Sequence, residues 1–177
     1  MNSIRFLKAS FHVVHMRTRF PFRYGIASMS EVPHLFLRAE IEIDGQPTTG
    51  ISAEGLPPKW FTKIPEATPE DELSGMLDSI TQASRNAGIV SEHPTLFDFW
   101  RELYHRQSEW AAKHNIPPLL SQFGVSLVER AMIDAFCRAK KCTFAEALAD
   151  NRFGIQLDVL HPELDSREPA DFLPAPG

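Results

Sequence analysis

The fold of this 177-residue chain is decided by one stretch, His34-Leu35-Phe36-Leu37-Arg38-Ala39-Glu40-Ile41-Glu42-Ile43-Asp44-Gly45. Its odd-numbered positions from 35 to 43 are apolar, whereas charged residues fill most of the even-numbered ones. A period of two is typical of an antiparallel strand that is buried on one face. Asp44-Gly45 favours a tight hairpin turn, because glycine tolerates the positive φ that such a turn requires. The sequence therefore predicts a strand over 34–43, a turn, and a returning strand over about 48–53.

The segments on either side of this hairpin extend it into a meander. Residues 4–14 show a broken alternation of apolar and polar side chains, which predicts a first strand. Two long connections are then expected, one over 17–31 between the first and second strands and one over 54–67 after the third. Loops of this length without structure of their own are often functional.

The apolar period becomes helical after Thr68. Helices are predicted from about 69 to 88, from 96 onward, from about 125 to 140, and over a short stretch after Thr143. Thr68, and Thr143 with Glu146, have the spacing expected of helix N-caps. Residues 160–177 are rich in proline and lack periodicity, so they are predicted to be a linker or a severed connection. The predicted fold class is α+β, with a three-stranded antiparallel meander followed by a small helical bundle.

Composition excludes several classes of function. The net charge of -5, from 18 basic and 23 acidic residues, argues against a nucleic-acid partner. No apolar run approaches the roughly 20 residues of a membrane helix, and no signal peptide is visible at the N-terminus. The chain has two cysteines, Cys137 and Cys142, which fit a reducing compartment. We therefore expect a cytoplasmic protein without a membrane partner.

The order of strands and helices resembles the N-terminal capping domain of the enolase superfamily, nearest to the mandelate racemase and muconate lactonizing branch. Three stretches carry the resemblance: Arg-Phe-Pro-Phe-Arg-Tyr-Gly at 19–25, Gly-Ile-Ser-Ala-Glu at 50–54, and the helical sequence over 124–135. The resemblance covers about residues 4–155. It implies a capping domain over 1–155 and a proline-rich tail or severed linker over 156–177.

The resemblance also implies what this chain lacks. In that superfamily a (β/α)-barrel follows the capping domain and supplies both the Mg²⁺ ligands and the bases that remove a proton next to a carboxylate. Such a barrel needs roughly 200 residues or more. The chain stops where its first strand would begin, with 154–159 as an expected remnant of that strand. We therefore expect no catalytic residue and no cofactor within the chain, with Mg²⁺ belonging to a complete enzyme. The expected partner is the missing barrel or a second copy of the chain.

In the resembling family, the loops after the first and third strands close over the barrel mouth and shape substrate specificity. Arg19, Arg23 and Tyr24 lie in the first of these loops, and Trp60 lies in the second. A guanidinium can clamp a carboxylate and an aromatic ring can exclude water, so these four residues are the expected contacts to a small carboxylate substrate. The structural alternative is that aromatic residues pin the loops to the core while the charges remain in solvent.

The sequence gives less support to other candidate sites. His12 and His15 are an odd number of residues apart on a strand and so lie on opposite faces, which prevents them from sharing an ion. Cys137 and Cys142 lack an identifiable base, and structural thiols are expected. No metal site is expected in the chain. Two rival hypotheses remain: a stand-alone binding or interaction module derived from the capping domain, and a small unrelated α+β enzyme that uses a cysteine or histidine.

Overall fold

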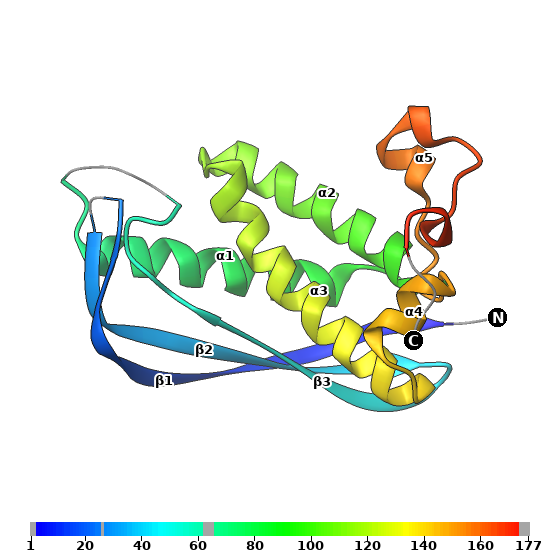
Figure 1. The fold of residues 1–177 in the computed structure, drawn as a ribbon, viewed down its shortest axis with the longest axis horizontal. Coiled ribbons are helices and arrows are strands. Elements are labelled where there is room, and N and C mark those ends of the chain that lie inside the picture. The colour runs from blue at the N-terminus through cyan, green and yellow to red at the C-terminus, as the bar shows by residue number, and fades with distance from the viewer. Residues whose placement is uncertain (1–2, 26, 62–65, 174–177) are drawn as a thin grey trace.

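A computed structural model describes residues 3–25, 27–61 and 66–173. Three strands, β1 (Ile4–Tyr24), β2 (Ala27–Ile43) and β3 (Gln46–Gly55), form one antiparallel sheet in the order β1-β2-β3. Three long helices, α1 (Pro69–Ile89), α2 (Leu96–His114) and α3 (Pro118–Lys140), lie together over one face of this sheet (Figure 1). The predicted fold class, an α+β chain with a three-stranded meander and a helical bundle, is confirmed.

The hydrophobic core lies between β2 and the helices. The odd-numbered side chains of β2 from Leu35 to Ile43 are all buried, whereas Arg38 on the opposite face is exposed and donates a 2.8 Å hydrogen bond to Glu40. The predicted register is therefore correct. Asp44 and Gly45 both have positive φ, 53° and 75°, as the tight turn into β3 requires.

The threonine signals located the starts of α1, α2 and α4. Thr68 caps α1 through a reciprocal bond pair with Asp71, and Thr143 caps α4 (Phe144–Ala149) in the same way with Glu146. The end of α1 at Ile89 agrees with the prediction to within one residue. The predicted start of α3 was wrong, because this helix begins at Pro118 rather than near residue 125. Gly88 and Gly124 lie inside helices, because a glycine costs only about 1 kcal/mol there and tertiary packing outweighs it.

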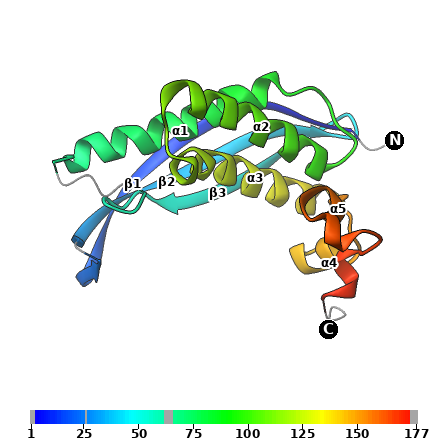
Figure 2. The same cartoon turned by 90° about the horizontal axis from the view of Figure 1, so that it is seen from above.

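The tail is more structured than the sequence suggested. Residues 157–160 form a short helix, α5 (Leu157–Leu160), so the expected remnant of a barrel strand at 154–159 is wrong. Two 3₁₀ turns follow, Pro162–Leu164 and Pro169–Asp171, and Pro169 is buried. The tail lies at the opposite end of the molecule from the tip of the β1–β2 hairpin (Figures 1 and 2). Within the described residues, none of the helices combines the length and the apolarity needed to cross a membrane.

Candidate functional site

The first predicted loop, over 17–31, is instead the outer part of a long β-hairpin. β1 and β2 remain paired from Phe22–Met29 to Tyr24–Ala27, beyond an irregularity in register between Arg17 and Phe22. Pro21 lies in this irregular stretch of an edge strand, which is where a residue without an N–H group is tolerated. We call residues 18–31 the hairpin arm. It bends away from the rest of the sheet at the end opposite the tail (Figure 1).

Tyr24 joins the hairpin arm to the loop that follows β3. Its hydroxyl donates a 2.6 Å hydrogen bond to the carbonyl oxygen of Pro58, and its ring lies 5.7 Å from that of Trp60, centroid to centroid. Burial raises the pKa of Tyr24, and the carboxylate of Glu72 raises it further, so the phenol stays protonated and can donate at neutral pH. The structure therefore brings together Tyr24 and Trp60, which are 36 residues apart.

Lys59 and Glu72 attach the loop after β3 to the first turn of α1. The backbone N–H of Lys59 donates a 2.7 Å hydrogen bond to the Glu72 carboxylate in the first turn of α1, and its ammonium group donates one of 2.9 Å to the carbonyl of Ala67. Lys59 has φ +58°, a strained value for a residue with a side chain, which these bonds stabilise. Lys59 therefore positions the loop.

Arg19 and Arg23 lie on the hairpin arm with exposed side chains. Neither forms an ion pair with another described residue, whereas Arg17 is paired with Glu31 at 2.8 Å. Phe22 stacks beside Tyr24 with 5.6 Å between ring centroids, and 52% of its surface is exposed. The arm thus carries two exposed guanidinium groups, and in the regular pairing of residues 22–24 Arg23 lies on the face opposite Phe22 and Tyr24. A guanidinium group can bind a carboxylate through paired hydrogen bonds.

A groove that the sequence analysis missed runs beside Trp60. It has a volume of about 540 Å³ and lies between the loop after β3, the hairpin arm and the start of α3, with Met29 and Leu119 on its walls. Phe61 closes its floor by packing on Phe123, with ring centroids 4.7 Å apart. The sequence analysis could not locate this groove, because Leu119, which lies on its wall, comes before the stretch that was predicted to be helical. The groove extends the exposed surface around Trp60.

The thiol of Cys137 lacks the lowered pKa that a nucleophile would need. Burial and then the neighbouring Cys142 raise the pKa of the Cys137 thiol to about 11, so it is protonated at neutral pH. Both cysteines are half-buried and free. Among residues 3–25, 27–61 and 66–173, no group of three histidine, cysteine or acidic side chains is placed to hold a metal ion.

No family model matches the sequence, and no curated protein does. Several solved structures resemble the chain at low identity. One is an enolase from Bradyrhizobium complexed with magnesium and mandelic acid, with 15% identity and a TM-score of 0.52, and the match covers 93% of this chain. Another is a mandelate racemase/muconate lactonizing protein from Herpetosiphon aurantiacus, with 12% identity, a TM-score of 0.50 and 77% of this chain covered.

The chain has the fold of part of each of these two proteins. It spans 43% of the length of the Bradyrhizobium protein and 32% of the Herpetosiphon protein. The resemblance seen in the sequence is thereby confirmed for the fold. At these identities it carries no substrate, reaction or ligand over to this chain.

Proposed function

We propose that the chain is the capping domain of an enolase-superfamily enzyme and binds a carboxylate substrate with its hairpin arm. The observation that carries this proposal is the bond from Tyr24 to the Pro58 carbonyl. It joins the arm, which carries Arg19 and Arg23, to the loop after β3, which carries Trp60.

In this proposal each group has a separate task. The guanidinium groups of Arg19 and Arg23 bind the substrate carboxylate through paired charge-assisted hydrogen bonds. Trp60, on the loop that Tyr24 joins to the arm, covers the apolar part of the substrate and excludes water from it. Tyr24 acts as a positioning residue, because its hydroxyl is already used to hold the Pro58 carbonyl.

The chemistry would take place on a barrel domain that follows residues 1–155 and to which residues 156–177 connect. The barrel would hold the Mg²⁺ ion and the base, and the reaction would be removal of a proton next to the carboxylate. Mg²⁺ stabilises the enolate that results. The chain described here would contribute substrate binding alone.

The test measures exchange of the α-proton of mandelate into deuterated water with Mg²⁺ present. The 177-residue chain alone should give no exchange above a heat-treated sample. A fusion of the chain to the part of the Bradyrhizobium protein that it does not match should exchange, and Arg23→Gln in that fusion should raise KM about tenfold. Arg85→Gln, at an exposed position on α1, is the matched control. The proposal would be contradicted if the chain alone catalysed exchange that EDTA abolishes. It would also be contradicted if Arg23→Gln left the KM of the fusion unchanged.

A further inference from the structure

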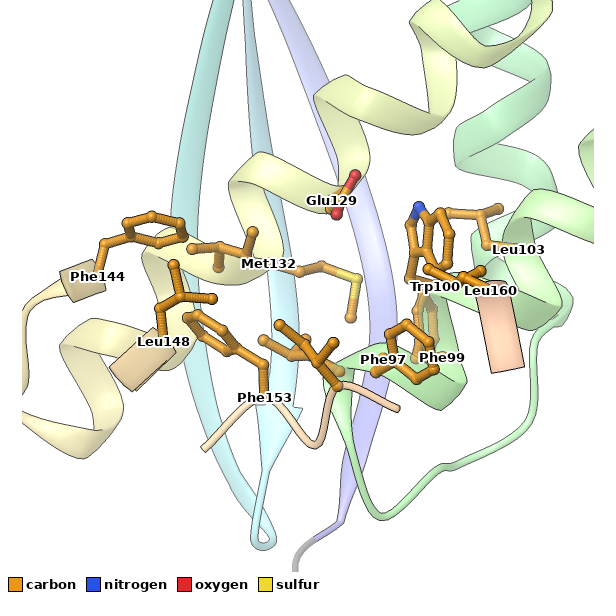
Figure 3. A pocket seen from close by; sticks show the side chains of 13 residues that line it. Phe97, Phe99, Trp100, Leu103, Glu129, Met132, Phe144, Leu148, Phe153 and Leu160 are labelled. Atoms are coloured by element: carbon orange, nitrogen blue, oxygen red, sulfur yellow. The ribbon is translucent and has the colours of Figure 1, made fainter. Parts of the chain in front are cut away.

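A second cavity lies near the tail, at the other end of the molecule from the hairpin arm. It has a volume of about 270 Å³, is partly open to solvent, and is lined by α2, α3, α4 and the segment after α4 (Figure 3). Its walls are almost entirely apolar, with Trp100 on α2, Met132 on α3 and Leu148 on α4. Glu129 on α3 is the one charged residue among those that line it.

The cavity is a built feature, because separate bonds fix its walls. The backbone N–H of Phe97 donates a 3.1 Å hydrogen bond to the carbonyl of Phe153, which ties the segment after α4 to the start of α2. Phe97 also stacks on Trp100, and Phe153 stacks on Phe144, with centroid distances of 5.6 and 5.8 Å. Aromatic pairs therefore stand on two sides of the cavity, and Leu160 from α5 covers part of it.

Glu129 is the unusual member of this lining. Its carboxyl group lies between Phe144 and Trp100 in Figure 3, and within the described residues it forms no hydrogen bond and no ion pair. The neighbouring cation, Arg130, bonds Glu54 at 3.2 Å instead. Burial raises the pKa of Glu129, as expected for a carboxyl group against apolar walls, and the charge of Arg130 lowers it by a smaller amount. A carboxylate held in such surroundings is costly unless a cation accompanies it.

We propose that this cavity binds a small primary amine that has an apolar, preferably aromatic, body. The ammonium group would pair with the Glu129 carboxylate and lie near the face of Trp100, and the body would fill the space between Phe97, Met132 and Phe153. An apolar cavity of about 150 Å³ can bind benzene, so one of about 270 Å³ suits an amine with a single aromatic ring. This site uses none of the residues of the hairpin arm, although Leu160, which lines it, belongs to the segment that would connect to a barrel.

The test titrates the 177-residue chain with 2-phenylethylammonium, with the neutral 2-phenylethanol and with the anionic 3-phenylpropionate. Calorimetry measures affinity, and ¹³C-labelled methyl groups of Met132 and Leu148 report the location of binding. We expect the ammonium to bind about tenfold more tightly than the alcohol, the anion not to bind, and both methyl signals to shift.

Two variants separate the role of Glu129 from the effect of net charge. Glu129→Gln should reduce affinity for the ammonium to that for the alcohol, whereas Glu109→Gln, which removes the same charge from an exposed position on α2, should leave it unchanged. Equal binding of the ammonium by both variants would overturn the proposal. So would a lack of binding at 10 mM, or shifts confined to other methyl groups. If Glu129→Gln does not fold, the proposal is tested on the unaltered chain, by its relative affinities for the ammonium, the alcohol and the anion and by the shifts of its methyl signals.

Discussion

The Tyr24 hydroxyl donates a 2.6 Å hydrogen bond to the carbonyl oxygen of Pro58, across 34 residues of sequence. The bond connects the end of an exposed edge strand to a loop that packs on the first turn of α1 through Lys59 and Glu72. A hairpin that projects from a sheet loses its order readily when few contacts hold it. This bond is therefore one of the contacts that position the arm, together with the ring contact between Tyr24 and Trp60.

Replacing Tyr24 by phenylalanine tests that role. The variant keeps the ring contact with Trp60 but leaves the Pro58 carbonyl without its donor, which should cost about 1 kcal/mol. Amide hydrogen exchange over residues 18–31 should accelerate, while exchange in α3 should not change. Tyr104→Phe is the control, since the Tyr104 ring is exposed on α2. Equal exchange in the arm of both variants would show that the bond does not hold it.

Two glycines allow close contacts between layers. A Cβ added at Gly50 would lie 1.9 Å from the carbonyl oxygen of Ala131, and one at Gly124 would lie 2.3 Å from that of Ser79. Gly50→Ala and Gly124→Ala should each lower the free energy of unfolding by about 3 kcal/mol or more, because backbone would have to move. Gly88→Ala meets nothing within 4 Å and should raise it by up to about 1 kcal/mol. Urea denaturation measures all three, and a tolerated Gly124→Ala would contradict the packing of α3 on α1.

The carboxyl group of Glu129 should make stability depend on pH. Burial raises its pKa in the folded chain above the value of about 4.3 in the unfolded chain. The folded state therefore binds the proton more tightly. Its stability falls as the pH rises from the unfolded pKa through the folded one. Glu129→Gln should be more stable at pH 7, with a melting temperature about 2–4 °C higher for each kcal/mol gained. The advantage should vanish near pH 4.

Asp71 provides a control of opposite sign. Hydrogen bonds from Thr68 lower the pKa of its carboxyl group, so its contribution is present above the unfolded pKa and is lost as the pH falls through the folded one. Asp71→Asn should therefore be less stable than the unaltered chain at pH 7, and the two should converge in acid. If Glu129→Gln follows the same course as Asp71→Asn, the assignment of a raised pKa to Glu129 is wrong.

The thiol of Cys137 should react slowly. With a pKa of about 11 it holds few thiolate ions at pH 8, whereas an unfolded cysteine has a pKa of about 8.5. Iodoacetamide at pH 8 should label Cys137 at least about a hundredfold more slowly in buffer than in urea, as measured by peptide mass spectrometry. Labelling of the folded chain at the rate seen in urea would revive the hypothesis of a cysteine-dependent enzyme.

Local chemistry explains which parts of the fold could be predicted. The alternation over 34–43, the Asp44-Gly45 turn and the threonine caps depend on neighbouring residues, and all were confirmed. The hairpin arm was missed because its apolar residues are exposed and its strands are interrupted by Pro21, so no buried face imposes a period of two. The early start of α3 was missed because the glycine at 124 fits against Ser79, a contact that the sequence alone does not reveal.

The candidate sites also differ in how far the sequence could predict them. Tyr24 and Trp60 were identified through the family resemblance, and the structure adds that they touch. The roles proposed for Arg19 and Arg23 remain predictions. No pattern in the sequence sets Glu129 apart, because its apolar surroundings come from α2, α4 and the tail. A cavity assembled from four separate segments leaves no pattern in any one of them.

The central claim, that the hairpin arm binds a carboxylate, is tested most directly by ¹⁵N chemical-shift titration of the chain with mandelate. The arm without a barrel should bind weakly, with Kd on the order of 1 mM, which corresponds to about −4 kcal/mol. The account predicts shifts in the backbone signals of residues 19–24 and in the Trp60 indole signal, absent with the neutral mandelamide and lost in Arg23→Gln but retained in Arg85→Gln. Shifts of equal size with mandelamide, or a response unaffected by Arg23→Gln, would contradict it.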